Sequence, residues 1–310
     1  MMISYEEKPK KIEHIPVMLE ECLENLNLHR GGTYLDLTLG AGGHSSAILK
    51  AGVKKLVSFD RDVDAIKSAQ LTFKDTPNIT IIHSNFYEVK KVLNKLGISK
   101  IDGVLIDLGV SSHQLDTAER GFSYMKEAKL DMRMNREDSK TAFQVVNDYE
   151  EAELIKIIKE YGEEKGAKFI ARAIILARPV ETTLELVNII KNAVPKKYEM
   201  DAVKRTFQAI RIEVNGELQI IESTIKDLIP FLNFGGRICI ITFHSLEDRI
   251  VKKTFKKLEN PCECPRALPC VCGNEKILSA KKMILPTEEE IKRNKRSKSA
   301  KLRVGESLGK

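Results

Sequence analysis

The sequence contains no tryptophan, only 6% aromatic residues and no apolar run approaching 18 residues. A membrane-spanning helix needs about 20 consecutive apolar residues, so this composition indicates a globular protein in water, without a membrane partner. Residues 1–14 also lack the apolar core of a secretory signal, which predicts a cytoplasmic location. The six cysteines are therefore expected in a reducing compartment, where disulfides are rare.

The 310 residues are enough to bury a hydrophobic core, and their net charge of +7 is unevenly placed. Residues 276–310 hold 11 Lys or Arg against 4 Glu, which accounts for the whole excess. The segment 292–303 (KRNKRSKSAKLR) is either a phosphate-contacting surface or a solvated charged end. If it contacts phosphates, the candidate residues are Lys292, Arg293, Lys295 and Arg296.

Four short apolar runs in the first third each end in an acidic or small polar residue: Asp36, Asp60, Ser84 and Asp107. Helix-like stretches separate them, so the pattern predicts repeated β-α units, a doubly wound α/β fold with a parallel sheet. A fifth strand is expected at 235–245. Because ligands bind at the carboxyl ends of such strands, the terminal acids are placed where chemistry would occur.

The interval between the fourth and fifth strands has helical periodicity instead, with apolar residues three and four apart. An all-helical insertion at the ligand edge is either a cap that builds the substrate site or a structural excursion. Residues 276–286 and 299–307 are expected as closing strands, forming a hairpin-like pair at one sheet edge.

The glycine turn after the first strand, Gly40 to His44, lets a backbone approach a ligand closely. Asp60, at the end of the next strand, suits a ribose diol in either a dinucleotide or an adenosyl cofactor. Asp36 would repel a pyrophosphate but suit the amino group of a methionine moiety. The turn favours S-adenosylmethionine over NAD, and a turn that binds nothing is the third alternative.

Asp107 ends the fourth strand, where a methyl acceptor would meet such a cofactor. Many amino-methyltransferases carry a D-P-P-Y-like motif there, whereas this chain has Asp-Leu-Gly-Val-Ser-Ser. An aromatic amine has a delocalised nitrogen lone pair, so catalysis must turn the NH2 group out of conjugation and accommodate positive charge on nitrogen. A carboxylate at position 107 can do both.

Several long motifs together resemble the ribosomal RNA small-subunit methyltransferase H family, also called the MraW family. In chain order these are DLTLGAGGHS, IDLGVSSHQLD, RGFSY with LDMRM, RTFQAIRIEVN, TFHSLEDRIVK and SAKLR. The resemblance implies a class I S-adenosylmethionine-dependent methyltransferase with an all-helical insertion domain. It also implies N4-methylation of a cytidine in the decoding centre of 16S ribosomal RNA, with the small ribosomal subunit as partner.

Site residues follow from the resemblance by position. With Asp36 and Gly40 from the turn, the implied cofactor contacts are Gly42, Gly43, His44, Asp60, Phe86, Asp107 and Gln114. The candidates for the acceptor cytidine are Asp107, Ser111, Ser112 and His244, although the pair His244-Ser245 is equally typical of a helix N-cap. The residues expected to face RNA are Asp131, Arg133, Arg205 and Arg211.

The resemblance divides the chain into a methyltransferase domain at 1–114 and 213–310 around a helical substrate-recognition insertion at 115–212. One departure concerns residues 200–204, Met-Asp-Ala-Val-Lys, where the family commonly has His-Pro before RTFQ. It leaves RNA positioning near this loop open. A DNA amino-methyltransferase, a noncatalytic factor that binds cofactor and RNA, and a homodimer also stay open.

Four cysteines, Cys262, Cys264, Cys270 and Cys272, form C-x-C-x5-C-x-C within the Cys-rich loop 260–275. Four thiolates suit tetrahedral zinc, but C-x-C is a less common pairing than C-x-x-C. Some members of the resembled family lack these cysteines, which implies that zinc is not needed for the chemistry. The sequence therefore predicts no metal in the reaction and leaves a structural zinc open.

Overall fold

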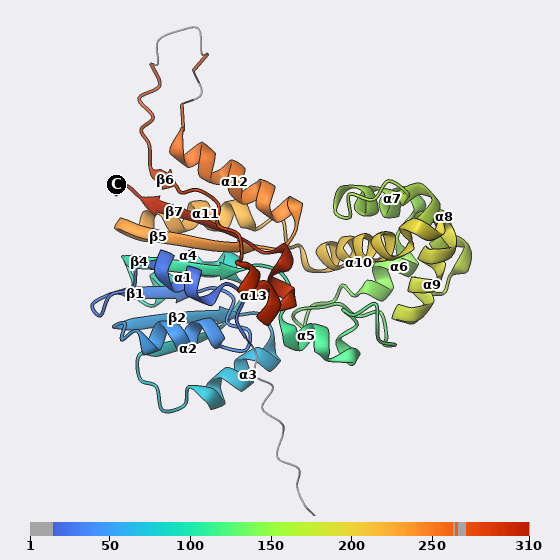
Figure 1. The fold of residues 1–310 in the computed structure, drawn as a ribbon, viewed down its shortest axis with the longest axis horizontal. Coiled ribbons are helices and arrows are strands. Elements are labelled where there is room, and N and C mark those ends of the chain that lie inside the picture. The colour runs from blue at the N-terminus through green and yellow to red at the C-terminus, as the bar shows by residue number, and fades with distance from the viewer. Residues whose placement is uncertain (1–14, 263, 266–270, 310) are drawn as a thin grey trace, which may run out of the picture.

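A single seven-stranded sheet organises the protein (Figure 1). The computed structural model describes residues 15–262, 264–265 and 271–309. Its strand order is β3-β2-β1-β4-β5-β7-β6. The strands are β1 (Thr33–Asp36), β2 (Lys55–Asp60), β3 (Ile79–His83), β4 (Ile101–Asp107), β5 (Leu232–Thr242), β6 (Leu278–Ala280) and β7 (Lys301–Ser307). Strands β1 to β5 are parallel and β7 is antiparallel to both neighbours, which confirms the predicted doubly wound, mostly parallel sheet.

Helices cover both faces of the sheet, so its central strands are apolar on both sides. In β4, Val104 and Ile106 face one apolar layer while Leu105 faces the other, as the two-residue period of a strand requires. The first layer includes α4 (Val89–Lys95), α11 (Ile221–Leu228) and α12 (Ser245–Glu259), and the second α1 (Leu19–Leu26) and α2 (Gly43–Lys50). The helix α3 (Val63–Thr72) packs against β2 and β3.

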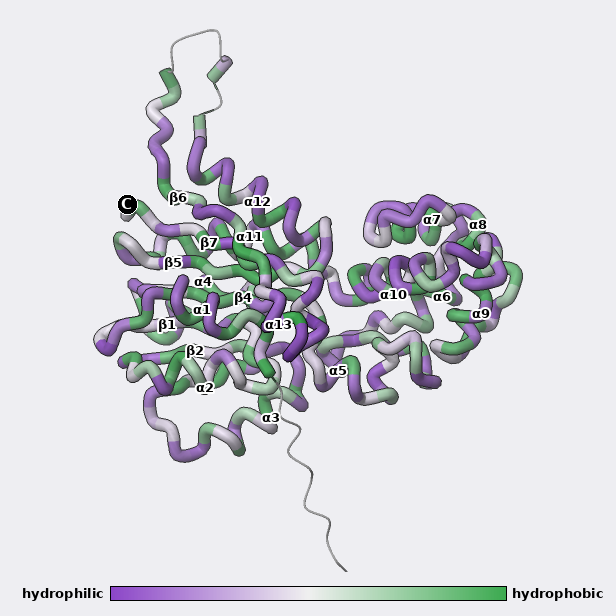
Figure 2. Tube along the Cα trace, in the orientation of Figure 1, coloured by the Kyte–Doolittle hydropathy of each residue, from purple (hydrophilic) through white to green (hydrophobic). Residues whose placement is uncertain are grey.

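The insertion between β4 and β5 is helical and forms a lobe beside the sheet (Figure 1). Its helices are α5 (Ser112–Asp116), α6 (Ala142–Asp148), α7 (Glu151–Glu160), α8 (Ala167–Ala177), α9 (Thr183–Ala193) and α10 (Glu199–Asn215). A separate apolar cluster spanning residues 122–214 fills this lobe, and Figure 2 shows apolar segments gathered there and again around the sheet. The boundaries at 115 and 212 remain predictions.

The last third corrects two expectations. The fifth strand spans Leu232–Thr242 rather than 235–245. The closing strands are shorter than 276–286 and 299–307, with twenty residues between them, but β6 and β7 do pair antiparallel at one edge of the sheet, as predicted. The basic segment between them is not an extended, solvated tail. It folds as α13 (Glu288–Arg293) and the 3-10 turn η5 (Lys295–Ser299). The remaining 3-10 turns are η1 (Phe86–Glu88), η2 (Ala118–Arg120), η3 (Lys196–Tyr198) and η4 (Ile229–Phe231).

None of the helices within the described residues is both long and apolar enough to pass through a bilayer.

The turn after β2 joins the sheet to the start and end of the insertion. The Arg120 side chain, 1% exposed, donates to Asp62 Oδ2 at 2.7 Å. It also donates to the backbone carbonyls of Arg133 and Met134, each at 2.9 Å. Next to Asp62, Arg61 donates to the Asn215 side chain at 2.8 Å. Folding removes these polar groups from water. The hydrogen bonds among them must therefore replace the hydrogen bonds that they made with water.

We expect Arg120→Met to lower the free energy of unfolding by about 3 kcal/mol or more, because it leaves the Asp62 carboxylate buried without its counter-charge. Chemical denaturation monitored by circular dichroism measures the change. Arg249→Met is the matched control: Arg249 pairs with Glu163 at 2.8 Å but its side chain is 51% exposed, so a loss under about 1 kcal/mol is expected. Equal losses in the two variants would contradict the assignment.

Candidate functional site

A cleft of about 520 Å³ opens at the carboxyl ends of the strands, where the order reverses between β1 and β4. The strands of the sheet form its floor, and the insertion contributes Tyr124, Met134, Gln208 and Arg211 to its wall. Most of the predicted cofactor and acceptor residues meet here. They are Gly40, Gly43, His44, Asp60, Phe86, Asp107, Ser111, Ser112, Gln114 and His244.

The glycine turn is held by Asp60. Gly40 has a φ of +51° and donates its N–H to Asp60 Oδ2 at 2.7 Å, while Oδ1 accepts from the Asp62 N–H at 2.8 Å. Burial raises the pKa of Asp60 to about 6, although these two hydrogen bonds partly oppose the shift. The carboxylate thus fixes the turn, and its oxygens in the cleft can also accept hydrogen bonds from the hydroxyl groups of a ligand.

Two predicted cofactor residues lie outside the cleft. Asp36 is 1% exposed, and its Oδ2 accepts from the Ser45 hydroxyl at 2.7 Å, so it holds the glycine turn from below. Burial raises the pKa of Asp36 to about 6. Gly42 has a φ of +78°, and a Cβ there would lie 2.9 Å from the Phe73 ring. In this structure Asp36 and Gly42 therefore support the turn, and their direct contact with a ligand stays a prediction.

Asp107 lies on the cleft floor and is poorly solvated. Its Oδ1 is buried without a hydrogen-bond partner among the described residues, and its side chain is 24% exposed, which leaves Oδ2 toward the cleft. Burial, and then the charges of Asp36 and Glu247, raise the pKa of Asp107 well above its usual range. An unpaired carboxylate in such surroundings is costly, and a ligand that donates a hydrogen bond relieves the cost.

His44 faces Asp107 as a neutral ring. Its Nε2 lies 3.1 Å from the Val17 carbonyl, which can only accept, so Nε2 carries the proton. Its Nδ1 lies 3.9 Å from Asp107 Oδ2. Burial lowers the pKa of His44 to about 4, so the ring is uncharged near neutral pH and Nδ1 is a hydrogen-bond acceptor.

Ser111 and Gln114 form a capping box at the start of α5. The Ser111 hydroxyl accepts from the Gln114 N–H at 3.2 Å, and the Gln114 amide oxygen accepts from the Ser111 N–H at 3.0 Å. The other end of the Gln114 amide donates to Asp62 Oδ2 at 2.8 Å. Both residues line the cleft, but these bonds show that they also set the position of the loop after β4.

His244 is a helix N-cap, as one of its two predicted alternatives has it, and its contact with an acceptor stays a prediction. It is the N-cap residue of α12, with Glu247 Oε2 accepting from the backbone of Phe243 and His244, and it also lines the cleft. Burial alone would raise the pKa of Glu247, but His244 and Arg211 bring it below the usual value. Arg211 itself makes a bidentate ion pair with Glu217 at 2.9 and 3.1 Å.

The other residues expected to face RNA are dispersed. Asp131 and Arg133 pair with each other at 2.8 Å, and Arg133 also donates to two loop carbonyls, so both fold their own loop. Arg205 lies 3.3 Å from Glu164 on the insertion. None of these three residues lines the cleft, although Met134 and Gln208 near them do. Arg296 does line it and pairs with Asp116 at 2.8 Å.

Several cleft residues were not predicted. Thr38 is not one of the strand-end acidic residues from which the site was predicted. Its hydroxyl oxygen accepts a hydrogen bond from the Asp107 N–H at 2.6 Å and so fixes the end of β4. Pro16 and Val17 close one side, and the Met18 N–H donates to Glu290 Oε1 of α13 at 3.0 Å. Because a Cβ on Gly43 would lie 2.4 Å from Pro16, glycine is required there for this closure. No sequence pattern marks contacts between such distant segments.

Comparison with known proteins places the chain among methylases. Residues 11–308 match the MraW methylase family. The chain is 55% identical over 305 residues to the ribosomal RNA small subunit methyltransferase H of Clostridium botulinum strain Kyoto, covering 95% of this chain and 98% of that one. The protein of the same name from Clostridioides difficile strain 630 is 53% identical, with coverages of 96% and 100%.

Among solved structures, an rRNA methylase from Streptococcus thermophilus is similar at a TM-score of 0.42 and 11% identity, covering 94% of this chain and 93% of that chain. The N-methyltransferase NodS from Bradyrhizobium japonicum has a TM-score of 0.41 and 8% identity, with 93% of each chain covered. These likenesses are too remote to add to the strand order described above.

We expect Asp107→Asn to raise the unfolding temperature by at least about 2 °C at pH 8, because it removes a desolvated charge. A carboxyl group with a raised pKa destabilises the fold where it is ionised, and protonation removes this cost as pH falls through that pKa. The gain should therefore shrink toward pH 5. Differential scanning calorimetry across this range, with the surface variant Asp227→Asn as control, measures it. No gain at pH 8 would contradict the electrostatic assignment.

Proposed function

The chain belongs to the MraW methylase family, and from that premise we propose that it methylates the exocyclic N4 of a cytidine in the decoding centre of 16S ribosomal RNA, within the small ribosomal subunit. S-adenosylmethionine is its methyl donor. The observation that carries the proposal is Asp107 on the floor of the cleft, a carboxylate with Oδ2 toward the cleft and a buried Oδ1 that has no hydrogen-bond partner among the described residues.

The cleft fits the donor. Its volume of about 520 Å³ lies within the usual range for small-molecule sites. Asp60 offers carboxylate oxygens for ribose hydroxyls, and Phe86 lines the cleft one strand further along, where an adenine would lie. The space around Gly40 is not crowded, because the nearest atom to an added Cβ would be 3.9 Å away. The backbone of Gly40 is therefore open to a ligand. When bound, S-adenosylmethionine supplies an electrophilic methyl group.

Asp107 accepts a hydrogen bond from the cytosine NH2 group and turns its nitrogen lone pair out of conjugation with the ring. The nitrogen becomes positively charged as the new bond forms, and the nearby carboxylate stabilises that charge. The raised pKa also suits Asp107 to take the proton that the nitrogen then loses. The neutral His44, with Nδ1 3.9 Å away, adds no competing positive charge.

The substrate reaches the cleft from the insertion side. Tyr124, Gln208 and Arg211 line that wall, and a cytosine must leave its stack to approach Asp107. A polar wall with one aromatic ring suits an unstacked base, because bases are held by stacking and by hydrogen bonds at their edges. We therefore assign substrate positioning to the insertion and methyl transfer to the strand ends.

Methyl transfer should fall at least ~100-fold in both Asp107→Ala and Asp107→Asn, with the alanine variant the weaker. Asparagine keeps a hydrogen-bond acceptor for the NH2 group but cannot take its proton. The assay follows labelled methyl from S-adenosylmethionine into small subunits that lack the modification, and nucleoside mass spectrometry identifies the methylated position. Asp227→Asn serves as the matched carboxylate control and should retain wild-type activity.

The outcomes separate the alternatives. Methyl transfer by the wild type to DNA but not to subunits would point to a DNA amino-methyltransferase. Binding of cofactor and subunits with no transfer to subunits, naked RNA or DNA would indicate a noncatalytic factor. Transfer to a ring carbon or a ribose hydroxyl would refute the N4 assignment while leaving the rRNA methyltransferase class intact.

The basic segment next to the cleft is proposed to grip RNA phosphates. Arg293 pairs with Glu290 at 2.7 Å and Arg296 pairs with Asp116, so these arginines are partly committed. Lys292 and Lys295 are exposed, and within the described ranges no ion pair engages them. Since α13 also contacts Met18 beside the cleft, these lysines lie where the RNA flanking an inserted base would pass.

Replacing Lys292 and Lys295 together with glutamine should weaken RNA binding and reduce the slope of log K against log salt by about 1.4. The control is Lys54→Gln with Lys100→Gln, because these lysines directly precede β2 and β4 and so lie at the amino ends of the strands, away from the cleft at their carboxyl ends. Filter binding across a salt series measures the slopes, and cofactor affinity should not change in either variant. A slope equal to that of the wild type would remove this segment from the RNA-binding surface.

A further inference from the structure

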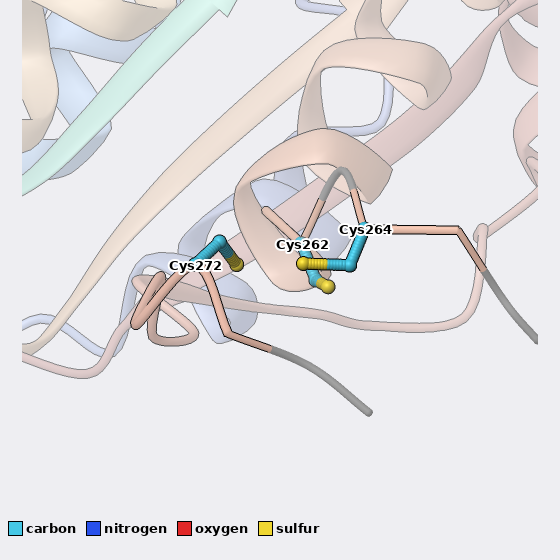
Figure 3. A group of neighbouring side chains, drawn as sticks. All are labelled: Cys262, Cys264 and Cys272. Carbon is cyan, nitrogen blue, oxygen red and sulfur yellow. The ribbon is translucent and has the colours of Figure 1, made fainter. Parts of the chain in front are cut away.

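Three cysteines beyond the cleft gather in the arm between α12 and β6 (Figure 1). The sulfur atoms of Cys262, Cys264 and Cys272 all lie within 4.8 Å of one another. Figure 3 shows the three side chains converging, two from the segment after α12 and one from the segment that returns toward β6. We propose that Cys262, Cys264 and Cys272 bind one zinc ion that fastens the two sides of this arm together.

The geometry is close to that of a zinc thiolate site. With Zn–S bonds of about 2.3 Å, the sulfurs of a tetrahedral site are about 3.8 Å apart, so the present cluster needs to close by at most about 1 Å. Three protein sulfurs leave one position for a fourth ligand. Cys270, the fourth member of the sequence motif, lies outside the described residues, and the proposal rests on the other three.

The described residues of the arm form no apolar core. None of its described residues between 260 and 277 is buried, and Val271 is 88% exposed. The two sides are joined by a hydrogen bond from the Asn274 amide to the Pro261 carbonyl at 3.3 Å, by one from the Ile277 N–H to the Leu258 carbonyl at 3.1 Å, and by a part-exposed ion pair between Lys276 and Glu259 at 3.2 Å. A segment without an apolar core commonly gains its order from a metal or a disulfide.

Zinc fits this cluster better than a disulfide. A disulfide joins two sulfurs and leaves the third unused, whereas one ion engages all three. Thiolates are also the ligands that zinc prefers in structural sites. The ion lies at the edge of the sheet away from the cleft residues, so it orders the arm and takes no part in methyl transfer.

The test is zinc stoichiometry in the full chain, without an affinity tag that binds metal. Protein is reduced, incubated with excess zinc sulfate, desalted and analysed by inductively coupled plasma mass spectrometry. About one equivalent is expected for the wild type and less than a tenth for Cys262→Ser with Cys272→Ser. The control Cys22→Ala removes a buried cysteine in α1 and should keep the full equivalent.

Two further measurements keep the result interpretable. Unchanged S-adenosylmethionine affinity in the double serine variant shows that it is folded, and zinc should slow proteolysis within 260–277 at least tenfold in the wild type only. Because thiols must lose protons to bind, zinc should be released as pH falls. Less than a tenth of an equivalent in the wild type, or full zinc retention by the folded double variant, would overturn the proposal.

Discussion

The ion pair between Arg120 and Asp62 is the constraint through which the two lobes and the cleft are held in one arrangement. Asp60, Arg61 and Asp62 are consecutive, yet the first fixes the glycine turn, the second holds the end of α10 and the third holds the start of the insertion. A shift of the insertion therefore pulls on the same turn that shapes the cofactor side. Under the proposed function, substrate positioning and cofactor binding therefore depend on the same three consecutive residues.

The carboxylate on the floor of the cleft is less well partnered than the one that joins the two lobes. Where Asp62 is fully partnered, Asp107 keeps one oxygen without a hydrogen bond and stands near the charges of Asp36 and Glu247. Such a group lowers the stability of the fold and persists because surrounding contacts hold it, such as the Thr38 hydroxyl at its backbone. The oxygen without a partner is the buried Oδ1, while Oδ2 is the oxygen toward the cleft, and the neutral His44 supplies no positive charge to offset the carboxylate.

The sheet was predictable because each buried parallel strand is an apolar run that ends at one edge. Gathering Asp60, Phe86, Asp107 and His244 at that edge follows from topology together with the long motifs. The role of Asp36 was not predictable, because a strand-end carboxylate looks the same in sequence whether it enters a cleft or supports a turn. Arg120 was missed since a lone arginine is normally exposed, and its partner lies 58 residues away.

The closure of the cleft by Pro16, Val17 and α13 has a consequence for the order in which the protein matures. Met18 and Glu290 are 272 residues apart, and Glu290 also receives the Ser297 hydroxyl at 2.6 Å. During translation, all five parallel strands emerge before the segment that closes this wall exists. A nascent chain can therefore assemble its parallel strands early but closes this wall of the cleft only after residue 290 has left the ribosome.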